Sequence, residues 1–90
     1  MAKLIFTESY TKKASKFIKK HPNLIGQYEK VLKLMEINPN HPSLRLHKLQ
    51  GNLSELYSIS INISYRITID FIIENDTIIP VDIGSHDKVY

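Results

Sequence analysis

Apolar side chains between residues 10 and 35 recur every three to four positions, which is the period of an amphipathic helix. In the first stretch the residues on the apolar face are Tyr10, Ala14, Phe17 and Ile18. In the second stretch they are Leu24, Tyr28, Val31, Leu32 and Met35. Pro22, which suits the first turn of a helix, separates the two. The sequence therefore predicts a helical hairpin that ends in the proline-containing segment 38–42.

After residue 43 the apolar period falls to two, the period of a strand with one buried face. A short extended segment comes first, with Leu44, Leu46 and Leu49. Isoleucines then alternate with serine and asparagine over residues 57–64, and apolar residues alternate with polar ones over 65–73. Thr77 to Ile83 is predicted to be the last strand. Because Pro80 has no N–H to donate, we expect an edge or a bulge there.

A short strand is also expected over residues 2–7, with Thr7 or Ser9 capping the first helix. The predicted order is β-α-α-β-β-β-β, an α+β fold. Strands joined by short turns form an antiparallel meander, and one face of that sheet packs on the helical hairpin in a two-layer domain. The other face is expected to be polar and solvated. Its residues are Ser58, Ser60, Arg66, Thr68 and Asp82.

The length and composition narrow the class of protein. Ninety residues suit one domain, residues 1–90. The chain has no cysteine, which excludes disulfides and thiolate metal sites. The first residues do not resemble a signal peptide, and nowhere do eighteen apolar residues follow one another. We therefore expect a cytoplasmic protein.

Charge is distributed unevenly along the chain. Residues 1–50 contain ten Lys and Arg against three Glu, whereas residues 51–90 contain two against six acidic residues. A basic half favours binding to a polyanion, although a lysine-rich helix is also ordinary as a solvated surface. The basic residues that we assign to nucleic-acid binding are Lys12, Lys13, Lys16, Lys19, Lys20, Arg45 and Lys48.

Three residues suit acid–base chemistry on RNA. The predicted strands bring His47, Arg66 and His86 to the polar face. One imidazole can take the proton of a ribose 2′-OH, another can protonate the leaving 5′-oxygen, and arginine can stabilise the charged transition state. The alternative is structural, with Arg66 in a surface ion pair with Asp70 or Asp82.

The remaining motifs point to no other chemistry. His21 and His41 each precede a proline and are interpreted as exposed turn residues without a role. A Walker loop, a dinucleotide glycine pattern and an HExxH motif are all absent from the sequence. We expect no metal and no cofactor.

Four short segments in this order resemble the RelE/ParE toxin superfamily, and in particular its RelE/StbE and YafQ-like branches. They are 46–51 (LHKLQG), 56–59 (LYSI), 64–67 (SYRI) and 83–90 (IGSHDKVY). The β-α-α opening and the lysine-rich first helix also fit. The resemblance implies a RelE-like two-layer fold and a ribosome-dependent mRNA endoribonuclease, the toxin of a type II toxin–antitoxin system. It also implies two partners: a cognate antitoxin, and the ribosome with its mRNA.

The same resemblance implies roles for individual residues. His47 and His86 match acid–base positions, Arg66 matches the arginine that stabilises the transition state, and Tyr90 matches a C-terminal aromatic that stacks on the substrate base or orients the phosphate. These four are the predicted catalytic residues.

Some positions depart from the family pattern. Ser58 and Ser60 stand where RelE has two lysines, and Asp82 stands near an arginine of the YafQ-like branch, where an acidic group would repel phosphate. Two alternatives stay open, and the departures bear on the second of them. One is a ParE-like inhibitor of DNA gyrase, which needs no paired acid and base, and the other is a catalytically inactive protein that binds an antitoxin.

Overall fold

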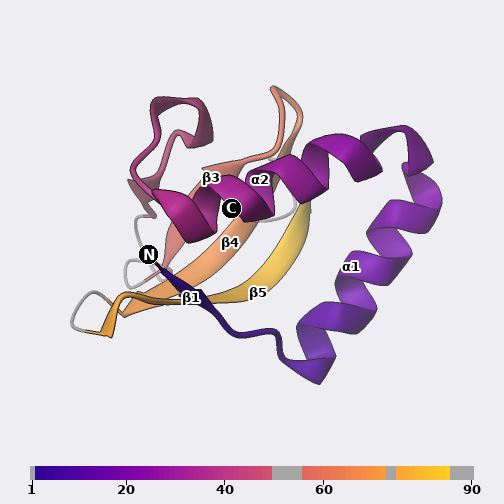
Figure 1. Ribbon diagram of the computed structural model, residues 1–90. Helices are drawn as coiled ribbons and strands as arrows, with labels where there is room; N and C mark the ends of the chain where they lie inside the picture. The colour runs from indigo at the N-terminus through magenta and orange to yellow at the C-terminus, as the bar shows by residue number, and fades with distance from the viewer. Residues whose placement is uncertain (1, 50–55, 73–74, 86–90) are drawn as a thin grey trace.

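The computed structural model describes residues 2–49, 56–72 and 75–85, in which two helices lie against a mixed sheet (Figure 1). The helical elements are α1 (Glu8–Lys20), the 3-10 turn η1 (Pro22–Leu24), α2 (Ile25–Ile37) and the 3-10 turn η2 (Pro42–Leu44). The strands are β1 (Lys3–Leu4), β2 (His47–Lys48), β3 (Tyr57–Ser60), β4 (Tyr65–Ile72) and β5 (Thr77–Ser85). The predicted α+β class and element order are confirmed.

Both predicted helices form. The Tyr10 N–H donates to Thr7 Oγ1 at 3.1 Å, so Thr7, one of the two predicted caps, begins α1. Tyr10, Ala14 and Phe17 are buried, as their spacing predicted. Pro22, however, begins the short turn η1, and α2 starts three residues later at Ile25. Pro22 thus belongs to the connection between the two helices.

The sheet has the order β1-β5-β4-β3-β2. From β2 to β5, each strand pairs antiparallel with the next strand along the chain, as the predicted meander requires. The first strand is shorter than the predicted 2–7 and pairs with β5 in parallel, which the sequence did not indicate. A register shift beside Ile69, whose partner is Pro80, confirms the irregularity expected at that proline. β5 continues two residues past Ile83, to Ser85.

The helix-facing side of the sheet contributes most of the apolar core. Ile59, Ile67 and Ile83 are paired across β3, β4 and β5, and all three are buried. Phe17 of α1 packs edge-on against Tyr65, which precedes Ile67 on the same side of β4. Each such buried side chain contributes about 1.5–3 kcal/mol to folding.

On the opposite side of the sheet the serines and the threonine are buried and not solvated, which corrects our prediction, whereas the side chain of Asp82 is 43% exposed. Ser58 and Thr68 are 0% and 3% exposed, and Ser60 is also buried. Cross-strand pairing places Ser58 beside Thr68 and Ser60 beside Arg66, so the predicted set does share one face. Alternation in a sequence fixes the face to which a side chain points, but it does not determine how far that face is covered.

Candidate functional site

His47 lies on β2, the edge strand next to β3, and its side chain is exposed. Its Nδ1 is 2.9 Å from the backbone carbonyl of Arg45. A carbonyl oxygen only accepts hydrogen bonds, so Nδ1 carries the proton, and in the neutral ring the lone pair is on Nε2. Arg45 adopts a left-handed conformation with φ of 50°, which turns its carbonyl toward the histidine two residues later. The local backbone therefore orients His47 with Nε2 as the basic atom.

Arg66 lies on β4, in the interior of the sheet, and is partly buried. It pairs with Ser60 on β3 and with Gly84 on β5. His47 pairs with Ser58, two residues from Ser60 on the same strand, so His47 and Arg66 point to the same face. Their backbones are separated by two strand spacings, about 10 Å, and by about 7 Å along the strands. Two long side chains can approach one phosphodiester from opposite sides at this separation.

Ser58 and Thr68 lie between His47 and β5, in a row that ends at Asp82. Their hydroxyl oxygens are buried and have no hydrogen-bond partner among the residues that the structure describes. A buried hydroxyl without a partner costs about 1–3 kcal/mol. The polar face therefore contains hydrogen-bonding capacity that the described part of the fold does not use.

Asp82 repels an anion less strongly than its sequence position suggests. Its carboxylate accepts a hydrogen bond from the Ile83 N–H at 2.8 Å and lies 3.9 Å from Lys13 Nζ of α1. Lys13 also donates to the carbonyl of Val81 at 3.3 Å. The ammonium group of Lys13 therefore offsets the negative charge at the edge of β5.

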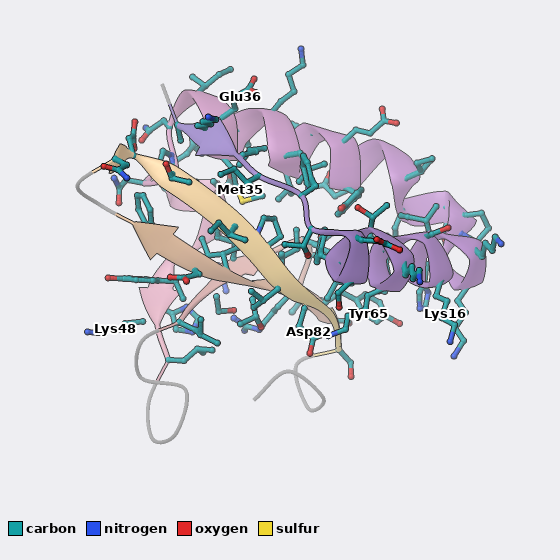
Figure 2. All side chains as sticks on the ribbon, turned by 90° about the horizontal axis from the view of Figure 1, so that it is seen from below. Lys16, Met35, Glu36, Lys48, Tyr65 and Asp82 are labelled. Atoms are coloured by element: carbon teal, nitrogen blue, oxygen red, sulfur yellow. The ribbon has the colours of Figure 1, made fainter. Side chains whose placement is uncertain are left out.

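The lysines of α1 are all exposed but do not form one uniform surface. Lys12 Nζ lies 3.5 Å from Glu8 Oε1, one turn earlier on α1. The other four line a groove between α1 and the end of β5: Lys13, Lys16, Lys19 and Lys20. Figure 2 shows Lys16 near Tyr65 and Asp82, with Lys48 at the opposite end of the molecule. The predicted basic residues thus lie on separate parts of the surface.

Sequence analysis missed an aromatic cluster in that groove. His21 was interpreted as an exposed turn residue, but its ring centroid lies 4.7 Å from that of Phe17 and 4.6 Å from that of Tyr65. His21 and Tyr65 are both half-buried. His21 is the C-cap of α1, four residues after Phe17, and this spacing was the available signal. His41 does fit a structural role, because its Nδ1 accepts from the Ser43 N–H at 3.2 Å and caps η2.

His86 and Tyr90 lie outside the described residues, so two of the four predicted catalytic positions remain predictions. Arg45 and Lys48 flank His47 and are exposed. Within residues 2–49, 56–72 and 75–85, no three His, Asp or Glu side chains are grouped as metal ligands would be. Neither α1 nor α2 is long and apolar enough to cross a membrane, and these are the two α-helices of the described chain.

Comparison with solved structures finds the same architecture in bacterial toxins. YafQ from E. coli strain BL21(DE3) matches with a TM-score of 0.79 and 11% identity, covering 100% of this chain and 99% of that one. The toxin in the E. coli DinJ–YafQ toxin–antitoxin complex matches with a TM-score of 0.77 and 13% identity, covering 99% and 97%. A copper-bound mutant toxin from Helicobacter pylori matches with a TM-score of 0.72 and 22% identity, covering 100% of both chains.

Searches at the level of sequence add nothing to this result. Neither a protein-family model nor a curated protein sequence matches significantly. The structural matches extend over nearly the whole chain at low identity, so they define its fold. The chain has the α+β fold of the RelE/YafQ-like toxins.

Proposed function

We propose that this chain is the toxin of a type II toxin–antitoxin pair and an endoribonuclease that cleaves mRNA on the ribosome without a metal ion. The observation that carries the proposal is the placement of His47 and Arg66 on one face of the sheet, two strands apart. The toxin fold supports the biological role, and the paired imidazole and guanidinium support the chemistry. An inhibitor of gyrase would not need an acid–base group beside an arginine.

The proposed reaction is an attack by the ribose on its own phosphodiester. A base removes the proton of the 2′-OH, the 2′-oxygen bonds to phosphorus, and the bond from phosphorus to the 5′-oxygen breaks. An acid protonates that 5′-oxygen, so the products are a 2′,3′-cyclic phosphate and a 5′-OH. N–H groups of Arg66 donate to the non-bridging oxygens, whose negative charge increases in the transition state.

The acid and base roles are assigned to His47 and His86. The hydrogen bond from Nδ1 of His47 to the Arg45 carbonyl supports Nε2 as the atom that exchanges a proton with RNA. His86 follows Ser85, the last residue of β5, in the sequence. The two imidazoles act as a pair, and Tyr90 is assigned to stacking on the substrate base or orienting the phosphate.

Two macromolecular partners follow from the proposal. The E. coli toxin YafQ forms a complex with DinJ, which supports a cognate antitoxin for this chain. The second partner is the ribosome with its mRNA, in the cytoplasm. Lysines of α1, together with Arg45 and Lys48, would contact phosphates of the ribosomal RNA or of the mRNA, and their exposure supports this.

Induction of the chain in growing bacteria, with mRNA 5′ ends mapped across the transcriptome, tests the function. Wild type should produce cleavage phased with codons, and Arg66→Ala should not. Lys30→Ala, which removes an exposed cation on α2 instead of one on the sheet, is the control and should cleave as wild type does. Growth arrest with DNA-damage signalling and no cleavage would instead identify a gyrase inhibitor. The absence of both effects would identify an inactive protein, with Ser58 and Ser60 in place of RelE's lysines as the reason.

A further inference from the structure

The groove between α1 and the end of β5 combines a basic rim with an aromatic floor. Its volume is about 810 Å³, within the usual range of ligand sites. Four lysines of α1 line it against one acidic residue, Asp82. The proposed reaction uses none of the aromatic residues in this groove. Their arrangement therefore calls for a separate explanation.

The floor consists of three rings in mutual contact. Phe17 is buried beneath the other two, and its ring meets that of Tyr65 edge-on at a centroid distance of 5.2 Å. His21 and Tyr65 are half-buried, so parts of both rings reach the surface of the groove. Aromatic rings at a surface stack on nucleobases with little dependence on sequence, because every base has a π-face. The floor thus has the chemistry of a base-stacking platform.

The rim has the complementary chemistry for phosphate. Lys16 and Lys20 are four residues apart, so they extend from the same side of α1. Lys13 is held near Asp82, whereas Lys16, Lys19 and Lys20 have no acidic partner within the described ranges. Figure 2 shows Lys16 extending from α1 on the side where Tyr65 lies. Within the described residues, three of the four groove lysines therefore keep a positive charge that no carboxylate pairs with, in the same groove as the aromatic rings.

The groove also lies next to the candidate catalytic face. Tyr65 pairs with Ser85, and the adjacent pair is Arg66 with Gly84. Consecutive residues of a strand point to opposite faces, so Arg66 and Tyr65 lie on either side of the same end of the sheet. Among the described residues β5 is an edge here, because β1 pairs with Thr77 and Ile78 at its beginning. The groove and the candidate catalytic face therefore lie on the two sides of one end of β4 and β5.

We propose that the groove binds one nucleotide of single-stranded RNA adjacent to the cleaved phosphodiester. The base stacks on Tyr65 and His21, and its phosphate contacts Lys16 and Lys20. An acidic peptide would satisfy the lysines but would leave the aromatic floor without a matching partner, so the floor favours RNA. That the bound RNA is the cleaved mRNA rests on the proposed function, whereas binding itself requires no cleavage.

A labelled hexanucleotide with 2′-O-methyl groups, which cannot be cleaved by 2′-OH attack, tests the groove by fluorescence anisotropy with the full chain. The variant Lys16→Glu/Lys20→Glu should bind at least about tenfold more weakly at low salt. The slope of log affinity against log salt should fall by about 0.7 for each lost phosphate contact. Lys30→Glu/Lys33→Glu on α2 makes the same change of charge away from the groove and should bind much as wild type does.

The stacking component needs its own pair of variants. Tyr65→Phe keeps the ring and should retain binding, whereas Tyr65→Leu should weaken it about tenfold. Because Tyr65 also packs on Phe17, circular dichroism must first establish that the leucine variant folds. If it does not, His21→Ala replaces it, with the same expected loss.

Two results would overturn the inference. One is equal loss of binding in the two charge-reversed variants, which would mean non-specific attraction. The other is groove-dependent binding of a glutamate-rich peptide with no binding of the oligonucleotide, which would assign the groove to an acidic protein segment. Groove-dependent RNA binding without cleavage on ribosomes would refute the proposed function and leave the nucleotide site standing.

Discussion

At the centre of the sheet, the two faces have similar burial and opposite chemistry. On the helix-facing side, Ile59 and Ile67 are 0% exposed and pack into the apolar core. On the other side, Ser58 and Thr68 are nearly as buried, yet their hydroxyls find no partner among the described residues. The first arrangement stabilises the fold, whereas the second costs stability. Sites at which a fold gives up stability are the expected places for function, and the polar face also carries His47 and Arg66.

The strongest test of the apolar face is Ile67→Ala. Removing this side chain should lower the free energy of unfolding by about 2–5 kcal/mol, because it leaves a cavity in the core. Urea denaturation followed by circular dichroism measures the change. Cleavage per folded molecule should remain near that of wild type. A loss of stability well under 1 kcal/mol would contradict the assignment of this face as the core.

Its neighbour Arg66 should show the reverse behaviour. Arg66→Ala should reduce cleavage about 100-fold or more, the scale of a lost transition-state donor, with little change in thermal stability. Arg66→Lys keeps the charge without the planar fork and should recover only part of the rate. Single-turnover rates and melting curves of both variants provide the measurement. Full activity in the alanine variant would remove Arg66 from the site.

Replacing the buried Ser58 hydroxyl on the polar face should change the free energy of unfolding less than a core substitution does, and in the opposite direction. Ser58→Ala removes an oxygen that has no partner among the described residues, so the free energy of unfolding should stay the same or rise by about 1 kcal/mol. Ile59→Val, one residue away on the apolar face, should lower it by about 0.5–1.5 kcal/mol. Urea denaturation of the two variants compares the faces directly. Equal destabilisation by both would mean that the polar face is ordinary core.

The smallest expected effect is on pH dependence. Burial, and next the hydrogen bond of 2.9 Å with the Tyr28 hydroxyl, raise the pKa of Tyr10 above its ordinary value of 10.0. Tyr10 therefore stays neutral in the folded chain. Its contribution to the stability of the fold is complete below pH 10. That contribution is lost as the pH rises further, because Tyr10 of the unfolded chain ionises first. Stability should decline above about pH 10 in wild type, and less steeply in Tyr10→Phe. Identical alkaline profiles would contradict this.

The elements with long repeating patterns were predictable from the sequence. The helical period identified Tyr10, Ala14 and Phe17 as buried, and strand alternation put Ser58 and Arg66 on one face. These results depend on local geometry, because the side-chain directions of a helix or strand are set by its own backbone. The irregularity beside Pro80 was predictable for the same reason.

Contacts between distant segments were not predictable. The parallel pairing of β1 with β5 involves two residues, too few to give a pattern, and more than seventy positions separate Lys3 from Thr77. The ring contact of His21 with Tyr65 likewise joins a helix end to a strand. The pairing of Asp82 with Lys13, which offsets the negative charge of Asp82, also joins a strand to a helix. Such contacts arise only when the layers pack.

We propose that RNA is cleaved by its own 2′-OH on the polar face of the sheet. The most direct test uses purified ribosomes with an mRNA in the decoding site, and compares an all-ribose message with one that has a single 2′-deoxynucleotide at the mapped cleavage position. We expect a 2′,3′-cyclic phosphate end from the first message and no cut at that position in the second, with slow cleavage of the first message by Arg66→Ala. Equal cleavage of both messages, or a 3′-OH end, would contradict it.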